Sequence, residues 1–259
     1  MNRRFKNRMG KRKIMKCGEE CEIIEYNDCD NIIVRFVKTG ELVKSRYGSF
    51  KRGSIKSHFT PTVYGVGVVG LETTRINGKL FKSYYTWQGI LERCYSKKYQ
   101  EKYPTYKGCK VCDEWKYYKN FKEWYDKNYY EIEEQKMALD KDILVKGNKI
   151  YNPDNCVFVP QDINKLFTKN DINRGGLPIG VCWHESRSRY QARCNIFDIV
   201  TKKSIKSKHL GLYNTPDEAF KAYKRVKEEN IKQLADYYRE QIPNKLYEGM
   251  YKYQVDIDD

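Results

Sequence analysis

The 259-residue chain carries 50 Lys and Arg residues against 34 Asp and Glu residues, which gives a formal net charge of +16. It has no apolar run close to the roughly 18 residues of a membrane-spanning helix and no apolar segment after its basic N-terminus, so we expect neither a membrane protein nor a secreted one. The charge favours nucleic acid or another anionic surface as partner, with a basic protein that lacks such a partner as the alternative. The nine cysteines are expected to be reduced thiols in an intracellular protein.

The N-terminal region is predicted to be a basic arm followed by a small β-rich module. Residues 1–16 hold eight basic residues and no acid, which predicts a mobile arm, either a phosphate-binding extension or a solvated tail. Residues 17–61 contain short alternating segments that predict strands near 22–26, 32–37, 42–47 and 50–55. Strands this short favour a small SH3-like, β-barrel-like module. It either contacts phosphate through the Lys and Arg of its last two strands or is an inert folding unit.

Residues 62–83 are expected to be an irregular linker. Gly65, Gly67 and Gly70 lie among valines there. No Gly-Lys-Ser or Gly-Lys-Thr and no suitable helical pattern follows, which excludes a phosphate-binding loop.

Two helices are predicted after the linker, because apolar residues recur at helical spacing from Tyr84 onward. The expected apolar face of the first comprises Tyr85, Trp87, Ile90, Leu91 and Cys94. The expected face of the second comprises Phe121, Trp124 and Tyr125.

Residues 139–167 combine the polar side chains best suited to chemistry. Asp140 and Asp142 open the stretch, a Gly-Asn turn follows at 147–148, and Tyr-Asn-Pro-Asp-Asn-Cys precedes an apolar run at 157–159. The predicted order is strand, loop, strand and helix, with Asn164 on the helix. This order brings carboxylate and amide oxygens together, as a divalent-cation site requires. Asp140-Lys141-Asp142 by itself would indicate a solvated turn.

Four cysteines raise the question of zinc. Cys109 and Cys112 have the spacing of half a zinc site, and only Cys94 and Cys156 are available to complete it. Because a second pair with this spacing is missing, four separately buried thiols are favoured over a zinc site.

The C-terminal part begins with a second predicted linker, residues 171–178, which contains Arg-Gly-Gly-Leu-Pro. Three strands are predicted at 179–183, 189–197 and 204–212. A helix follows at a capping box formed by Thr215 and Glu218, with Pro216 at the first helical position. We place the end of this domain at residue 240, and residues 241–259 form a tail with a short helix at 245–253.

Four motifs in the middle of the chain suggest a family. They are Arg-Cys-Tyr at 93–95, Val-Cys-Asp-Glu-Trp at 111–115, Leu-Asp-Lys-Asp at 139–142 and Tyr-Asn-Pro-Asp-Asn-Cys at 151–156. With Trp87 before them and Asn164 after them, they resemble the HNH-type endonucleases of bacteriophages, many of which are homing endonucleases. The resemblance implies a ββα-metal core over residues 84–170 that binds one Mg²⁺ or Mn²⁺ and hydrolyses a phosphodiester bond. The implied catalytic residues are Asp140, Asn155 and Asn164, and the implied metal ligands are Asp140, Asp142 and Asn155.

The expected core lacks the His that polarises the attacking water in that family. The three His residues of the chain are His58, His184 and His209. Asp140 takes the place of the base, although a free Asp has a pKa of about 3.9 against about 6.5 for His. Three cases remain open. Asp140 is a metal ligand while hydroxide or another side chain is the base, or the enzyme is slow, or the core has lost its activity and is kept for DNA binding.

The C-terminal domain, residues 179–240, suggests a second family. Ile-Gly-Val at 179–181, Tyr-Gln-Ala-Arg at 190–193 and the run from His209 to Ala219 resemble an AP2-type DNA-binding domain. The resemblance implies a three-stranded sheet laid into the major groove of double-stranded DNA and braced by the helix. The candidate DNA-binding residues are Arg187, Arg189, Tyr190, Arg193, Lys206 and Lys208, with Trp183 near the same face. A charged but idle sheet face is the alternative.

Together these predictions describe a multidomain α+β protein with a β-barrel-like module, an HNH-like core and an AP2-like sheet with a helix. The implied function is that of a metal-dependent DNA endonuclease in the cytoplasm of a bacterial host. A non-catalytic DNA-binding protein or regulator with a degenerate core is the first alternative. A protein-binding or anti-defence factor, whose basic surface mimics or blocks another nucleic-acid binder, is the second.

Overall fold

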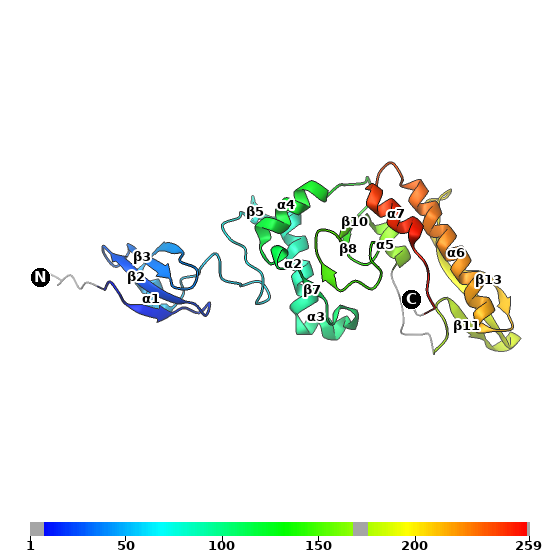
Figure 1. Cartoon of the computed structure of the whole chain (residues 1–259), viewed down its shortest axis with the longest axis horizontal. Helices are drawn as coiled ribbons and strands as arrows, with labels where there is room; N and C mark the ends of the chain where they lie inside the picture. Colours follow the sequence, from blue (N-terminus) through cyan, green and yellow to red (C-terminus); the bar gives the residue numbers. More distant parts are fainter. Residues whose placement is uncertain (1–7, 168–175, 258–259) are drawn as a thin grey trace, which may run out of the picture. The chain divides into compact units, whose positions relative to one another are not determined.

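The computed structural model describes residues 8–167 and 176–257 (Figure 1). It divides into two compact units, residues 1–127 and 128–259, and each unit is described by itself. Both contain helices and small sheets, which confirms the predicted α+β class. Within the described ranges, the helices are too short or too polar to cross a membrane.

The first unit begins with an antiparallel sheet. Its strands are β1 (Arg12–Ile14), β2 (Glu20–Tyr26), β3 (Ile32–Phe36) and β4 (Leu42–Ser45), paired in that order, and α1 (Tyr47–Arg52) follows them. Alternation along β3 turns Ile32, Val34 and Phe36 toward the core, where they belong to one cluster with Phe50 of α1.

Two details of this module differ from the sequence prediction. Strand β1 lies within the segment expected to be a mobile arm. The residues before it, Gly10 and Lys11, form hydrogen bonds with the backbone of Ile23 at 2.8 and 2.9 Å, so this segment covers the edge of β2. The expected strand at 50–55 is absent from the described structure. Residues 47–52 are helical there, and Gly53 (φ 66°) ends the helix by donating to the Phe50 carbonyl. The sheet is therefore open rather than barrel-like. Residues 1–7 of the expected arm lie outside the described residues.

The expected linker at 62–83 is folded against the helices that follow it. Val68 exchanges backbone hydrogen bonds with Lys116 and Tyr118 at 2.8 and 2.9 Å. A hairpin of β5 (Arg75–Ile76) and β6 (Lys79–Leu80) comes next. A Cβ on Gly67 would lie 2.5 Å from Leu91 Cδ1, so glycine there allows close packing of the chain on a helix.

The rest of the first unit is mainly helical. It contains α2 (Lys82–Tyr95), α3 (Lys97–Lys102), the short strand β7 (Lys110–Val111) and α4 (Tyr118–Asn128), which ends at the boundary between the units. The predicted face of α2 is confirmed for Trp87, Ile90, Leu91 and Cys94, which are buried. It is wrong for Tyr85, which is 73% exposed.

The second unit opens with the predicted order of strand, loop, strand and helix. Strand β8 (Met137–Asp140) pairs antiparallel with β10 (Val157–Pro160), and α5 (Gln161–Phe167) follows β10 directly. The loop between the two strands contains β9 (Ile150–Tyr151). Residues 168–170, the expected end of the nuclease core, lie outside the described residues.

A three-stranded antiparallel sheet and two helices complete this unit. The strands β11 (Val181–His184), β12 (Arg189–Asp198) and β13 (Lys203–Tyr213) pair in sequence order, as predicted. Helix α6 (Pro216–Tyr237) begins with the predicted capping box, since Glu218 N–H donates to Thr215 Oγ1 at 3.2 Å and Thr215 N–H to Glu218 Oε2 at 3.3 Å. Helix α7 (Asn244–Lys252) lies within one residue of its predicted position at both ends. Residues 171–175 of the expected linker are outside the described residues.

One hydrophobic core joins the parts of the second unit. Val157, Val159 and Ile163 pack in one cluster with Leu234 of α6 and Leu246 of α7. The residues expected to form one nuclease core, 84–170, are therefore divided between the two units, because those from 137 to 167 pack with the C-terminal helices.

Candidate functional site

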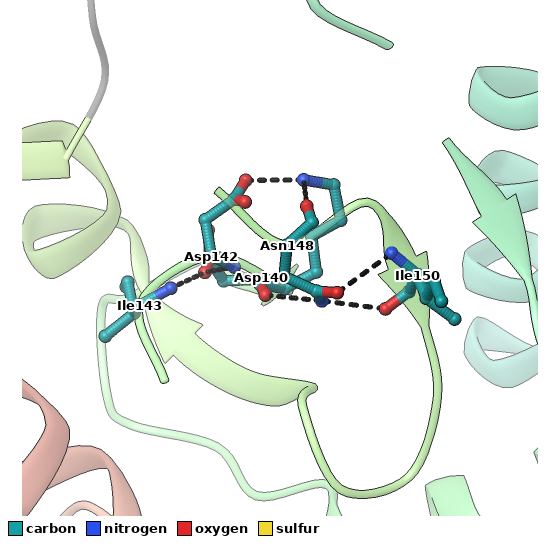
Figure 2. Close-up of polar contacts among 6 residues, drawn as sticks. Asp140, Asp142, Ile143, Asn148 and Ile150 are labelled. Atoms are coloured by element: carbon teal, nitrogen blue, oxygen red, sulfur yellow. Dashed lines mark hydrogen bonds and ion pairs between the residues drawn. The ribbon is translucent and has the colours of Figure 1, made fainter. Parts of the chain in front are cut away.

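Asp140, at the end of β8, closes the loop that follows it (Figure 2). Its Oδ1 accepts hydrogen bonds from the backbone N–H groups of Asp142 and Ile143 at 2.7 and 2.8 Å. This is the local side-chain-to-backbone bonding that makes Asp frequent in turns. Its Oδ2 accepts no hydrogen bond from another described residue, so one carboxylate oxygen remains available.

A buried lysine holds the same loop from inside. The Lys141 side chain is 8% exposed, and its Nζ donates to Asp142 Oδ2 and to the Asn148 carbonyl, both at 2.6 Å. The Asn148 amide donates in turn to the carbonyls of Lys141 and Ile150, at 2.9 and 2.8 Å, and accepts from Ile150 N–H at 3.0 Å. Sequence reasoning missed the roles of Lys141 and Asn148. The signals were a Lys between two acids and an Asn after the glycine of a turn.

The environment of Asp140 raises the pKa of its carboxyl group. Burial is the largest cause, and the nearby Asp142 adds to it. The two backbone N–H bonds and the Lys141 ammonium oppose the rise. The net increase makes Asp140 a stronger base than an exposed Asp, which bears directly on its predicted role as the base.

The other expected catalytic residues lie on either side of β10. Val157 pairs with Asp140, and Asn155 is two residues before Val157, so Asp140 and Asn155 lie at the same end of the β8–β10 pair. Asn155 N–H donates to Asn152 Oδ1 at 2.8 Å, which fixes the turn that carries it. Asn164 lies on α5, which begins at the opposite end of β10, next to the Pro160–Met137 pair.

The acids of the loop offer hard oxygen donors. Asp140 Oδ2 and Asp142 Oδ1 accept no hydrogen bond from another described residue, and oxygen ligands of this kind suit Mg²⁺ or Mn²⁺. These two atoms and the Asn155 amide are the oxygen donors among the predicted ligands of a divalent cation. No group of three or more His, Cys, Asp or Glu side chains suited to a metal occurs in the described part of the chain.

The four cysteines considered for zinc are not joined in disulfides. Cys94, Cys109 and Cys156 are buried and Cys112 is half-buried. Cys94, Cys109 and Cys112 belong to the first unit and Cys156 to the second.

The three-stranded sheet packs one face against α6. Ala192 of β12 clusters with Ala219, and Cys194 clusters with Tyr223. Just before β11, Gly180 has φ 75°, and a Cβ on it would lie 2.1 Å from the Tyr223 ring. Glycine is therefore required here by conformation and by space.

The opposite face of the sheet carries exposed cations. Successive residues of a strand point to opposite faces, so Arg189 and Arg193 lie opposite the buried Ala192 and Cys194, and both are exposed. Arg187, on the turn before β12, and Lys206 of β13 are also exposed. Lys208 of β13 is exposed too, but it pairs with the buried Cys194, so it lies on the side of α6 and not on the opposite face. None of these five forms an ion pair with another described residue. We call Arg187, Arg189, Arg193 and Lys206 the basic face. Seven basic and two acidic residues lie between Ile179 and Thr215.

Tyr190 differs from the other predicted DNA-binding residues. It packs with Val181 and Ala192 on the side that faces α6, and its ring lies 4.9 Å from that of its strand partner Trp183. Adjacent strand residues cannot share a face, so Tyr190 and Trp183 are separated from Arg189 and Arg193 by the sheet itself.

A hydrogen-bond network that sequence reasoning missed orders the exposed face. Gln191, which is 7% exposed, accepts from Arg193 Nε at 2.7 Å and contacts His209 Nδ1 at 2.7 Å. Arg193 Nη1 also donates to Ser207 Oγ at 3.4 Å. The signal in the sequence was Gln191 two residues before Arg193, hence on the same face.

No protein-family model, curated protein or solved structure matches the chain, so its candidate sites are defined by residues and geometry alone.

Proposed function

We propose that this protein binds double-stranded DNA through the basic face of its C-terminal sheet. The observation that carries the proposal is a set of four exposed cations, Arg187, Arg189, Arg193 and Lys206, without an ion-pair partner among the described residues, on or next to the face opposite α6. Phosphate contacts by such cations release counterions and supply most of the affinity for duplex DNA. The major groove, about 12 Å wide, admits a β-ribbon, in which Arg reaches base edges and Lys mainly contacts phosphate.

Support by α6 suits this role. The helix packs on the far side of the sheet, with Ala219 and Tyr223 against β12, and leaves the basic face open to a partner. Part of the proposal is an intracellular location, such as a bacterial cytoplasm, in keeping with nine cysteines that form no disulfide.

The test is a salt titration of binding to a 30-base-pair duplex by the full chain. Replacing Arg187, Arg189 and Lys206 together with Ala should weaken binding and reduce the slope of log K against log salt by about 0.9 for each phosphate that is no longer neutralised. The matched control removes three exposed cations from α6, through Lys221→Ala, Arg225→Ala and Lys232→Ala. Equal losses of affinity in both triple variants, or no binding by the wild type at low salt, would refute the proposal.

DNA cleavage is a second candidate function, favoured by one observation: Asp140 is a half-buried carboxyl group with a raised pKa and one unoccupied oxygen. A base of this kind, positioned near a phosphodiester, takes a proton from the attacking water. The Asn155 amide, at the same end of the strand pair, would orient the phosphate, and Asn164 on α5 is a further candidate for that role. A divalent cation held at Asp142 would stabilise the leaving oxygen and leave Asp140 Oδ2 free to act as the base.

Nicking of supercoiled plasmid in Mg²⁺ or Mn²⁺, against an EDTA control, tests this candidate. Asp140→Asn keeps an acceptor for the two turn hydrogen bonds but removes the base, so nicking should fall by at least 100-fold. Asn155→Ala should also reduce it. Asp154→Asn, an exposed acid in the same turn, is the matched control and should retain activity. Binding without nicking would leave the non-catalytic DNA-binding function as the conclusion.

A further inference from the structure

Arg193 is held at two of its three guanidinium nitrogens. Its Nε donates to Gln191 Oε1 at 2.7 Å, and its Nη1 donates more weakly to Ser207 Oγ at 3.4 Å. A guanidinium carries five N–H donors. The remaining three, on Nη1 and Nη2, donate to no other described residue. The free end of the fork therefore presents two parallel donors.

Gln191 is fixed at both ends of its side-chain amide. Arg has no acceptor, so the amide oxygen must face Arg193 and the amide nitrogen must face His209. His209 Nδ1 then accepts at 2.7 Å, which places the imidazole proton on Nε2. Rotation of the amide would break both contacts and place N–H groups against Arg193. Because Gln191 lies in the central strand and is 7% exposed, water has little access to replace these bonds.

The second support of Arg193 is also built into the sheet. Ser207 lies at an irregularity in the β12–β13 pairing and has φ 54°. Its backbone N–H donates to Asn195 Oδ1 at 2.8 Å. Asn195, like Gln191 and Arg193, alternates with the buried residues of β12. Polar side chains of two strands thus hold one arginine in place before any ligand is bound.

We propose that Gln191 is a positioning residue that holds the Arg193 fork end-on toward a guanine, so that the sheet selects DNA sequence rather than binding phosphate alone. This inference rests on the proposed DNA binding. The O6 and N7 atoms of guanine are two adjacent acceptors on the major-groove edge, and they match two parallel Arg donors. The side chains of Arg189 and Lys206 donate no hydrogen bond to another described residue, which suits contacts to phosphate.

The first experiment uses a pool of duplexes with 20 randomised base pairs, from which the full chain selects its preferred sequences. The wild type should select a guanine at one position or more. Arg193→Lys keeps the charge but lacks the fork, and should lose that preference, with the ratio of selected-site to random-pool affinity falling at least about tenfold. Gln191→Leu should lose it as well, while affinity for the random pool stays within about twofold and the salt slope is unchanged. Gln191→Glu restores an acceptor for Arg193 and should retain the preference.

The second experiment needs no DNA. In the free protein, the Arg193 Nε–H should give a slowly exchanging NMR resonance, because it donates to a buried oxygen. The resonance should disappear in Arg193→Lys, exchange fast in Gln191→Leu and persist in Gln191→Glu. The exchange rate of this resonance in the wild type tests the positioning role even if Gln191→Leu fails to fold.

The outcomes separate this inference from the proposed function. A wild type that binds no duplex overturns both. A wild type that binds DNA and selects guanine, while Gln191→Leu selects the same base with the same ratio, overturns the positioning role alone. A fast-exchanging Arg193 Nε–H in the wild type does so too.

Discussion

The loop at 140–150 and the outer face of the C-terminal sheet are both rich in charge, yet they treat it in opposite ways. In the loop, the Lys141 ammonium is buried against Asp142 and the Asn148 carbonyl, and Asp140 binds backbone N–H groups. On the outer face of the sheet, Arg189 and Lys206 are exposed and have no ion-pair partner among the described residues. Charged groups that are paired within the chain stabilise its fold. Unpaired charged groups on a surface that a helix supports are available to a binding partner.

The largest expected effect comes from removing the support of the sheet. Gly180→Ala places a Cβ 2.1 Å from the Tyr223 ring at a φ of 75°, and steric overlap together with left-handed strain should cost about 3–5 kcal/mol of unfolding free energy. Chemical denaturation measures this loss. Gly176→Ala has φ 81° and no atom within 4 Å, so it should lose only the strain, about 1 kcal/mol. Equal losses would show that Tyr223 does not confine Gly180.

Lys141 and Lys206 form a matched pair, one buried and one exposed, whose contributions to stability should differ. Lys141→Met leaves the Asn148 carbonyl and Asp142 without their buried donor and should cost about 2 kcal/mol in unfolding free energy. Lys206→Met removes the same group from an exposed site and should change stability by at most about 0.5 kcal/mol. DNA affinity should respond in the reverse order. A destabilising Lys206→Met or a neutral Lys141→Met would contradict the division between the two regions.

Lys227 on α6 provides a third case, since its side chain is buried but its ammonium forms no hydrogen bond or ion pair with another described residue. Burial lowers the pKa of its ammonium, and Cys194 opposes this only weakly. Lys227→Met should therefore raise the unfolding free energy by about 1 kcal/mol near neutral pH. Because the folded protein releases the Lys227 proton at a lower pH than the unfolded chain, the gain should shrink as pH approaches about 10.4. A gain that grows with pH would exclude this explanation.

The last prediction concerns how the unfolding free energy depends on pH through Asp140. Its pKa is raised in the folded state, so the folded protein binds more protons than the unfolded chain just above the unfolded value of about 3.9. Wild-type stability relative to Asp140→Asn should therefore fall as pH rises through that window, with a slope of at most about 1.4 kcal/mol per pH unit. Urea unfolding of both proteins from pH 4 to 7 measures it. A rising difference would mean that the carboxylate is stabilised rather than destabilised by its surroundings.

Local features of the fold were predictable from the sequence. The order of β8, loop, β10 and α5 followed from short apolar runs, and the start of α6 from the Thr215 and Glu218 capping box. The residues 47–52 were misassigned because a Gly in the left-handed conformation ends a helix as readily as it ends a strand. Gly67 looked like part of a linker, because the sequence does not show that Leu91 packs onto it.

The candidate sites were predictable only in part. Asp140 and Asn155 were placed at one end of a strand pair by the spacing of the motifs. The partners of Lys141 could not be predicted. Asn148 is seven residues away, and only the path of the loop determines which atoms come into contact. Tyr190 was grouped with Arg189 although neighbouring strand positions face opposite sides.

The closed loop at 140–150 also has a consequence for the order of folding. Its contacts join residues at most ten positions apart, as in the hydrogen bonds of Lys141 and Asn148, and loops of about ten residues close within about 10–100 ns. The packing of Val157 with Leu246 spans nearly ninety residues, so it requires a much larger loss of chain entropy. Pulse-labelling hydrogen exchange during refolding should therefore find the Ile143 and Ile150 amides protected before those of α7.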